Sequence, residues 1–314
     1  MYMSKKPLII LTGPTAVGKT ALSIKLAKAI NGAIISADSM QVYRGMDIGS
    51  AKIMPEEMDS VEHYLIDVLE PDEEFHVVRF QEMAKAAMEN IYAKGQVPIV
   101  TGGTGFYIQA LLYDIDFTSQ EEDTAFREKL EYLANQHGNE FLHDMLKAVD
   151  PVSAEKIHAN NRKRVIRALE FYEKTKTPIS EHNETEAAKD SPYGFCYFVL
   201  NDDREKVYER IEKRIDLMLE MGLIDEVKNL QDKGYHKSMV SMQGLGYKEI
   251  LSYLEGEITL EEAIYILKRD TRHFAKRQLT WFRRESDVIW IQKPEYANDD
   301  AILAFMMEKI NLIL

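Results

Sequence analysis

The feature that most constrains the fold is a glycine-rich loop between an apolar run and an amphipathic segment. The loop, Gly13-Pro14-Thr15-Ala16-Val17-Gly18-Lys19-Thr20, matches G-x-x-x-x-G-K-[S/T] at every specified position. The apolar run Leu8–Leu11 precedes it, and Leu22, Leu26 and Ile30 follow at helical spacing. Between a buried strand and a helix, such a loop points backbone N–H groups at phosphate oxygens, and the helix N-terminus adds a positive dipole end. The sequence therefore predicts a diphosphate-binding loop at the carboxyl end of a first strand.

The rest of the chain alternates short apolar runs with helical patterns. We expect further strands at 33–36, 64–68, 97–100, 195–200 and 288–291, and helices at 20–30, 78–93 and 204–233. Unpatterned apolar strands that alternate with helices are typical of a parallel sheet covered on both faces. From Thr118 to about Lys189 the periodicity is helical and no strand is evident. The prediction is a P-loop NTPase-like α/β core formed by 1–116 and 190–314, with an all-helical insertion domain over 117–189.

Charge and cysteine content narrow the class of protein. The net charge of −13 argues against a nucleic-acid partner when it is taken as an average. Two basic islands, 162–167 and 268–284, depart from that average, and each fits either a phosphate-binding surface or a solvated helix face. The single cysteine, Cys196, excludes an internal disulfide, and no apolar run approaches the roughly 20 residues of a membrane helix. We expect a cytoplasmic protein without membrane association.

The loop by itself leaves the reaction open. No apolar strand ends in a free aspartate of the Walker B kind, because Val97–Val100 runs into Thr101-Gly102-Gly103-Thr104. An Asn-Lys-x-Asp motif for guanine is also absent from the sequence. A small-molecule kinase and a nucleotide-sensing RNA-binding protein therefore remain alternatives at this point.

Polar residues near the predicted phosphate crevice supply the chemistry. Asp38 and Gln41 follow the second strand, and carboxyl ends of parallel strands converge on the ligand crevice in doubly wound sheets. Asp38 fits a general base, or alternatively a turn cap. Arg210 and Arg214 are spaced i, i+4 on one helix face, which suits a diphosphate, although pairing with neighbouring glutamates fits the spacing equally well.

Together these segments resemble one family, the tRNA dimethylallyltransferases, also called tRNA isopentenyltransferases. Besides the phosphate loop, the resemblance is carried by strings spread over nearly the whole chain. They are Ala37-Asp38-Ser39-Met40-Gln41-Val42-Tyr43, Met46-Asp47-Ile48-Gly49-Ser50-Ala51-Lys52, Gly102-Gly103-Thr104-Gly105-Phe106-Tyr107, Arg164-Val165-Ile166-Arg167-Ala168-Leu169-Glu170, Gly246-Tyr247-Lys248-Glu249 and Ala275-Lys276-Arg277-Gln278-Leu279-Thr280-Trp281-Phe282-Arg283. The last string is the most specific, because no general rule predicts it.

The resemblance implies a reaction. The dimethylallyl group of dimethylallyl diphosphate moves to the exocyclic N6 amine of the adenosine at tRNA position 37, just 3′ of the anticodon, and diphosphate leaves. The implied tRNAs read codons that begin with U, the implied partner surface is the anticodon stem-loop, and the implied cofactor is Mg²⁺ on Thr20. We also expect a monomer.

The resemblance also implies roles for individual residues. Asp38, Lys19, Arg214 and Thr104 are the expected catalytic groups, and Arg210 joins the loop in binding the diphosphate. Which of the two arginines faces the diphosphate stays open. The expected tRNA contacts are Asp38, Ser39, Met40, Gln41, Thr104, Arg127, Lys163, Arg164, Val165, Ile166, Arg167, Gly246, Tyr247, Lys248, Lys276, Arg277, Gln278, Trp281 and Arg283.

Overall fold

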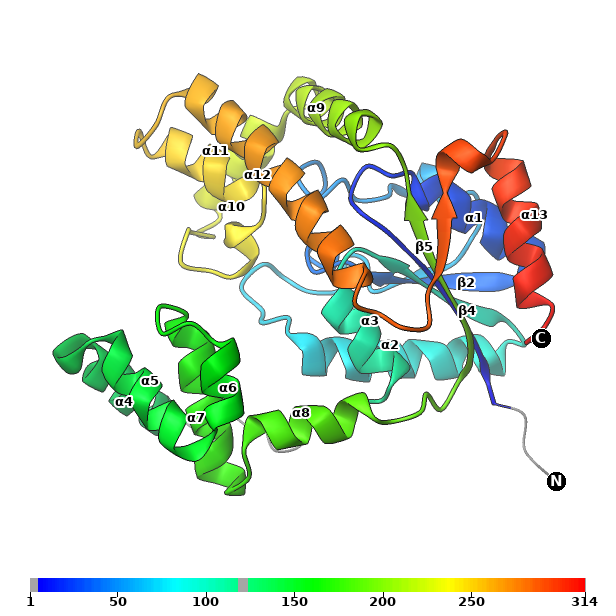
Figure 1. Cartoon of the computed structure of the whole chain (residues 1–314). Helices are drawn as coiled ribbons and strands as arrows, with labels where there is room; N and C mark the ends of the chain where they lie inside the picture. Colours follow the sequence, from blue (N-terminus) through cyan, green and yellow to red (C-terminus); the bar gives the residue numbers. More distant parts are fainter. Residues whose placement is uncertain (1–4, 118–123, 314) are drawn as a thin grey trace. The chain divides into compact units, whose positions relative to one another are not determined.

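The chain folds into two compact units (Figure 1). The computed structural model describes residues 5–117 and 124–313. One unit comprises Met1–Leu111 and Pro192–Leu314, and the other comprises Leu112–Ser191. The predicted core and insertion domains included residues 1–4, 118–123 and 314, which lie outside the described residues.

The first unit is built on a six-stranded sheet in the order β3-β2-β4-β1-β5-β6, in which every pairing is parallel. This confirms the predicted parallel sheet flanked by helices. The first strand lies at the centre, where Ile9 is in register with Ile99 of β4 on one side and Cys196 of β5 on the other. The strands are β1 Pro7–Thr12, β2 Gly32–Ala37, β3 His63–Tyr64, β4 Val97–Gly102, β5 Gly194–Asn201 and β6 Ile289–Gln292.

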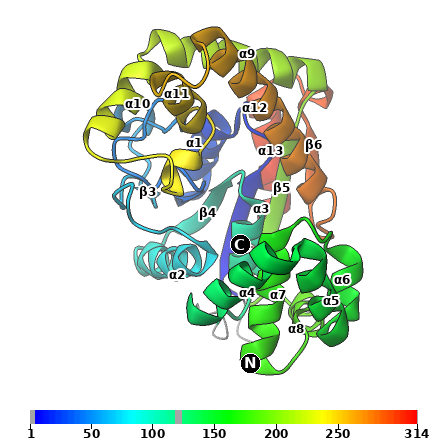
Figure 2. The same cartoon turned by 90° about the vertical axis from the view of Figure 1, so that its left-hand side faces the viewer.

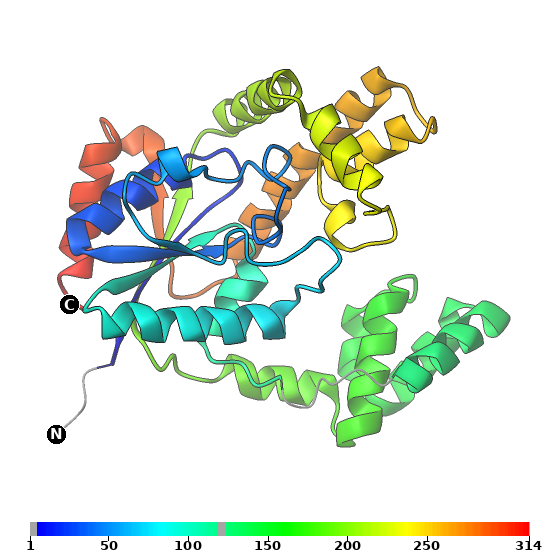
Figure 3. The same cartoon turned by 180° about the vertical axis from the view of Figure 1, so that it is seen from behind.

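Helices cover both faces of this sheet, as Figures 1 and 3 show. On one face, the apolar stripe of α1 (Lys19–Ile30) and the buried residues of α13 (Asp299–Ile310) pack with inward side chains of β1 and β5 in one core cluster. On the other face, α2 (Val77–Ala93) contacts β2 and β4. The strands are buried on both faces, which explains why they read as continuous apolar runs in the sequence.

The α-helices between β5 and β6 in the chain form a group (Figure 2). Each of them contacts its neighbours in the group, with α12 against both α9 and α11. A short helix, α3 (Gly105–Leu112), follows β4. The group consists of α9 Arg204–Glu220, α10 Leu223–Asp232, α11 Tyr247–Leu254 and α12 Leu260–Phe282. Single-turn 3₁₀ helices in the described residues lie at Pro55–Glu57, Ser241–Gln243 and Lys293–Glu295.

Three details of the sequence prediction are wrong. The expected helix 204–233 is two helices, because Gly222 adopts a left-handed conformation with φ 100° between α9 and α10. The expected strand 64–68 ends at Tyr64, since Leu65 and Asp67 also have positive φ, and the Asp67 and Val68 N–H groups bond to carbonyls of the 41–42 segment. The last strand begins one residue later than expected, at Ile289.

In the described residues of the second unit, all regular secondary structure is helical. Its helices are α4 Thr124–His137, α5 Asn139–Val149, α6 Pro151–Lys156, α7 Arg162–Thr175 and α8 Ile179–Ala187. Leu130, Leu142 and Leu146 form its core together with Val165 and Ile166 of α7. Val165 and Ile166 were expected to contact tRNA. Both side chains are buried in this core, and tRNA contacts at these positions stay a prediction. Over the described residues, no helix has the length and apolar character needed to cross a membrane.

Candidate active site

The carboxyl ends of three neighbouring strands are tied to one another. The Thr12 hydroxyl of β1 donates to the Gly102 carbonyl of β4 at 2.7 Å, and the Thr101 hydroxyl donates back to the Leu11 carbonyl at 2.9 Å. The Thr104 N–H then donates to the carbonyl of Ala37, the last residue of β2. The loops that begin at residues 13, 38 and 103 are therefore neighbours at one edge of the sheet.

The phosphate loop has the backbone conformation that its glycines predict. Gly13 and Gly18 have φ of 147° and 100°, in the region that glycine adopts most easily. A β-carbon at Gly13 would lie 2.2 Å from the Leu200 carbonyl oxygen, so the loop can pass β5 this closely only without a side chain. The Lys19 ammonium folds over the loop and donates to the carbonyls of Gly13 and Pro14.

Lys19 lies among other charged groups that bring its pKa into the physiological range. Burial, followed by the positive charge of Arg214, lowers the pKa of Lys19 from 10.5 to about 7, while Asp38 acts in the opposite direction. Because each of these charges reaches Lys19, the structure brings together three of the four residues predicted to be catalytic. The fourth, Thr104, is half-buried and lies in the neighbouring loop.

Asp38 combines both of the roles that the sequence left open. Its Oδ1 atom accepts the N–H groups of Met40 at 2.8 Å and Gln41 at 3.4 Å, which is the arrangement of a turn cap. In the described part of the chain, Oδ2 has no hydrogen-bond partner. Burial raises the pKa of Asp38, and the two backbone N–H groups and Lys19 oppose this effect. The cap thus fixes the carboxyl group while one oxygen remains available to a ligand.

The two arginines of α9 have different surroundings. Arg210 forms an ion pair with Asp202, a buried residue just beyond the end of β5. Arg214 has no ion pair among the described residues. Burial of the guanidinium, followed by the positive charge of Arg210, lowers the pKa of Arg214. Of the two, Arg214 is the one whose charge acts on Lys19. The alternative partners were Glu205, Glu209 and Glu212. Two of these pair elsewhere, Glu209 with Lys213 and Glu212 with Arg272.

A carboxylate that the sequence analysis missed holds the segment after Asp38. Glu226 of α10 accepts the backbone N–H groups of Asp47, Ile48 and Gly49 at 2.9, 2.7 and 3.0 Å, and the Tyr247 hydroxyl at 2.8 Å. Tyr247 was expected to contact tRNA. Its side chain is fully buried in this structure, and a tRNA contact at this position stays a prediction. Two of the strings that carry the family resemblance, 46–52 and 246–249, are therefore packed against each other.

Lys52 fixes the same segment from its other end. Its side chain is almost completely buried, and the ammonium donates to the Tyr43 carbonyl and pairs with Asp47 and Asp67. The Gln41 amide donates to the Ala51 carbonyl at 3.2 Å. The sequence signal for Lys52 was its place in a family string, and nothing about its chemistry predicted burial.

The Gln278 side chain joins α12 to two of the site loops. Its Oε1 atom accepts the Thr15 N–H at 2.9 Å, and its Nε2 atom donates to the Gly103 carbonyl at 3.0 Å. A β-carbon on Gly103 would lie 2.0 Å from that Nε2 atom, and one on Gly105 would lie 2.2 Å from the Trp281 ring. Gly103 and Gly105 are thus needed for the close approach of α12.

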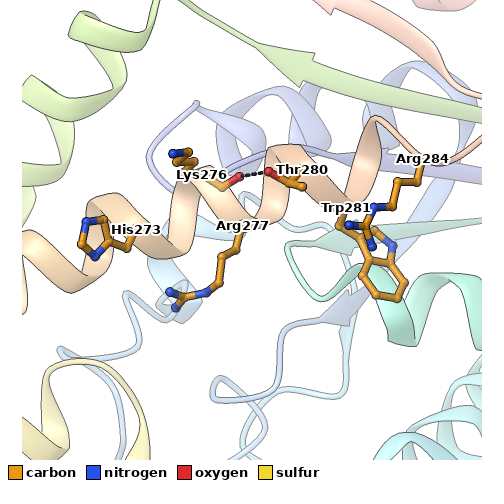
Figure 4. A pocket seen from close by; sticks show the side chains of 6 residues that line it. All are labelled: His273, Lys276, Arg277, Thr280, Trp281 and Arg284. Carbon is orange, nitrogen blue, oxygen red and sulfur yellow. Dashed lines mark hydrogen bonds between the residues drawn. The ribbon is translucent and has the colours of Figure 1, made fainter. Parts of the chain in front are cut away.

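The C-terminal part of α12 presents cations to solvent. Lys268, Arg269 and Arg272 in the first part of the basic island are paired with acidic residues. The later members form no ion pair within residues 5–117 and 124–313; they are Lys276, Arg277, Arg283 and Arg284. A cavity of about 460 Å³ lies here, and Figure 4 shows the side chains around it, all from this helix and its end. Its lining residues are His273, Lys276, Arg277, Thr280, Trp281 and Arg284.

The basic island of the helical unit is also divided. Arg162 pairs with Glu131 at 3.0 Å, and Arg127 forms a two-pronged ion pair with the buried Glu170, with both distances 2.9 Å. Lys163 and Arg164 are exposed and have no ion pair in the described region. Arg127 is therefore part of the internal structure of this unit, whatever else it contacts.

Comparison with known proteins identifies the family. The family model described as IPP transferase matches residues 41–285. A tRNA dimethylallyltransferase of Lachnoclostridium phytofermentans is 63% identical over 303 residues, which cover 96% of this chain and 97% of that protein. The chain belongs to the tRNA dimethylallyltransferase (IPP transferase) family. The enzyme of the same name from Acetivibrio thermocellus is 55% identical over 296 residues, 94% of each chain.

Solved structures of the family share this fold. The tRNA isopentenylpyrophosphate transferase of Bacillus halodurans has 44% sequence identity and a TM-score of 0.73, with 98% of both chains covered. A eukaryotic dimethylallyltransferase acting on tRNA has 28% identity and a TM-score of 0.83, over 98% of this chain and 80% of that one. The family resemblance inferred from the sequence strings is thereby confirmed.

The lowered pKa of Lys19 makes stability depend on pH. The unfolded chain holds the Lys19 proton up to about pH 10.5, whereas the folded chain releases it near pH 7. Between these values the unfolded state binds more protons, so the Lys19 contribution to the free energy of unfolding rises with pH, by at most about 1.4 kcal/mol per pH unit. We expect wild type to gain stability relative to Lys19→Met between pH 7 and 9 in urea unfolding. Parallel pH curves for the two proteins would contradict this.

Proposed function

We propose that this enzyme transfers the dimethylallyl group of dimethylallyl diphosphate to N6 of the adenosine at tRNA position 37 and releases diphosphate. The observation that carries the proposal is the arrangement of Asp38, which has one free carboxyl oxygen, beside Lys19 and Arg214. A base and two cations in one crevice suit a reaction in which an amine loses a proton while an anion departs. Relatives of this chain bear the name of that activity.

The bond changes assign a task to each group. The N6 lone pair forms a bond to C1 of the allyl group, the C1–O bond breaks, and its electrons leave with the diphosphate. The N6 proton passes to Oδ2 of Asp38, which is held in place through Oδ1. The loop N–H groups, Lys19 and Arg214 stabilise the negative charge that develops on the leaving group. Protonated Lys19 then exchanges its bonds to the Gly13 and Pro14 carbonyls for phosphate oxygens.

The residues present fit a magnesium ion held together with the diphosphate. Thr20 is exposed in the first turn of α1, and its hydroxyl has no hydrogen-bond partner among the described residues. No cluster of three potential metal-ligating His, Cys, Asp or Glu side chains occurs in that part of the chain. Mg²⁺ commonly takes one or two protein oxygens plus phosphate oxygens and water. When bound, it would neutralise charge on the diphosphate, with Thr20 as its protein ligand.

The exposed cations provide a surface for the RNA backbone. Lys276, Arg277 and Arg283 have no acidic partner among the residues that the structure describes, so binding to phosphates does not require them to break ion pairs seen there. The target adenine has to leave the anticodon-loop stack to reach Asp38, and this costs little in a loop that is already single-stranded. We propose the anticodon stem-loop of tRNAs that read codons beginning with U as the substrate. Cytoplasmic location and a monomeric state remain predictions.

The proposal is tested by direct transfer. The protein is incubated with dimethylallyl diphosphate, Mg²⁺ and an unmodified transcript of a tRNA whose anticodon ends in A, and the RNA is digested and analysed by mass spectrometry. We expect one dimethylallyl group on the adenosine at position 37 and none on a transcript with G at that position. Consumption of ATP without prenylated adenosine would instead support the kinase alternative.

Replacing Asp38 separates its two roles. In Asp38→Asn, Oδ1 can still accept the Met40 N–H, but the side chain can no longer take the N6 proton. We therefore expect kcat to fall about 100-fold or more while the melting temperature stays near that of wild type. Asp38→Ala should lose both properties, with about 1 kcal/mol less stability for the missing cap. A near-normal rate for Asp38→Asn would leave Asp38 as a cap alone.

The pairing pattern on α12 predicts which cations bind RNA. Arg277→Gln removes an unpaired charge and should reduce the slope of log affinity against log salt by about one, whereas the matched variant Arg272→Gln removes a charge already paired with Glu212. Fluorescence anisotropy with an anticodon stem-loop RNA between about 50 and 200 mM salt gives both slopes. Equal slopes for Arg277→Gln and wild type would show that this surface is solvated and does not contact RNA phosphates.

A further inference from the structure

A lysine far along the chain lies at the phosphate loop. Strand β6 runs parallel to β5, with Gln292 in register with Asn201, so the chain leaves β6 at the same edge of the sheet as it leaves β1, β2, β4 and β5. The next residue is Lys293, at the start of a single 3₁₀ turn. The topology therefore delivers this side chain to the edge where the phosphate loop begins.

The distance to the loop is short. A β-carbon placed on Gly18 would lie 3.2 Å from Nζ of Lys293, so the ammonium rests directly beside the Gly18 backbone. Gly18 is exposed, and it belongs to the run of residues whose N–H groups bind anions in loops of this type. The ammonium of Lys19, by contrast, is directed to the carbonyls of Gly13 and Pro14 at the beginning of the loop. The two lysines thus flank the loop at opposite ends.

An acidic residue holds Lys293 in this position. Asp299, in the first turn of α13, accepts from Nζ at 3.0 Å, and both side chains are mostly shielded from solvent, with 21% and 31% exposed. An ammonium group has three donors. In the described part of the chain, Lys293 uses only one of them, on Asp299. Two donors therefore remain for oxygens of a ligand in the loop.

We propose that Lys293 is a second diphosphate-binding lysine, whose ammonium donates to non-bridging oxygens of the leaving diphosphate from the Gly18 end of the loop. This inference rests on the proposed function, since it assigns a further contact to the same diphosphate. Lys293 lies beyond residues 41–285, which match the family model. Asp299 acts through Lys293, as a positioning residue.

The test measures binding of inorganic pyrophosphate to the full-length protein by titration calorimetry, with Mg²⁺ and without tRNA. Lys293→Gln should weaken binding about tenfold, as expected for the loss of a charge-assisted hydrogen bond. Lys293→Arg, which keeps the charge, should restore most of the affinity. The matched control is Lys25→Gln, because Lys25 forms an ion pair with Asp300 in the same turn of α13 but on the exposed surface, and this variant should bind as wild type does.

Asp299→Asn distinguishes ligand binding from a structural role. This variant breaks the ion pair and keeps the ammonium, so it should lose less affinity than Lys293→Gln. Equal losses in the two variants, with equal shifts in melting temperature, would show that the pair only joins β6 to α13 and would overturn the inference. Unchanged affinity in Lys293→Gln would overturn it as well.

The same titrations separate this inference from the proposed function. If wild type binds pyrophosphate, Lys19→Met abolishes binding and Lys293→Gln has no effect, only the role of Lys293 is refuted. If wild type neither binds pyrophosphate nor prenylates tRNA, the proposed function fails, and the role of Lys293 fails with it.

Discussion

The amide of Gln278 is the interaction on which the organisation of the site most depends. A single buried side chain accepts from the Thr15 backbone and donates to the Gly103 backbone, so it fixes two loops relative to each other and to α12. The bond to Gly103 is buried and the bond from Thr15 is partly buried, so replacing the Gln278 amide would leave the buried Gly103 carbonyl unpaired, at a cost of about 1–3 kcal/mol. Only glycine at positions 103 and 105 lets the helix come this close. The helix that carries the unpaired cations is thereby placed next to the phosphate loop.

The charges at the site are balanced around Lys19. Burial and Arg214 favour the neutral amine and Asp38 favours the ammonium, which together bring the pKa of Lys19 to about 7. An arriving diphosphate shifts this balance towards the charged form, because it adds negative charge beside the ammonium. A site with closely spaced cations and few anions is poorly stabilised when empty, and its free energy falls when the anion binds. Arg210 adds to the repulsion on Arg214, and its ion pair with Asp202 offsets part of that positive charge.

The segment between Asp38 and Lys52 has little regular structure and is held by side chains instead. Glu226 takes up three consecutive N–H groups, and Lys52 joins two carboxylates and a carbonyl from inside the fold. These interactions come from α10, from Asp67 and from the segment itself, so the position of Asp38 depends on residues nearly 190 positions away in sequence. The strained conformations at Leu65 and Asp67 serve the same purpose, since they let the 65–68 segment bond to the 41–42 backbone.

The sequence by itself determined the parallel sheet, the phosphate loop and the family, because each depends on local patterns: short apolar runs, glycine spacing and contiguous strings. It also placed Asp38 beside the phosphate loop that carries Lys19, since parallel strands end at a common edge, whereas Arg214 was assigned to the site only through the family resemblance. It could not separate Val165, Ile166 and Tyr247, which are buried, from Lys163 and Arg164, which are exposed, because neighbours in a string share no common environment. Nor could it show that Arg210 forms an ion pair whereas Arg214 forms none with the residues described. Only tertiary structure decided these points, because burial and charge pairing depend on distant segments that meet after the chain has folded.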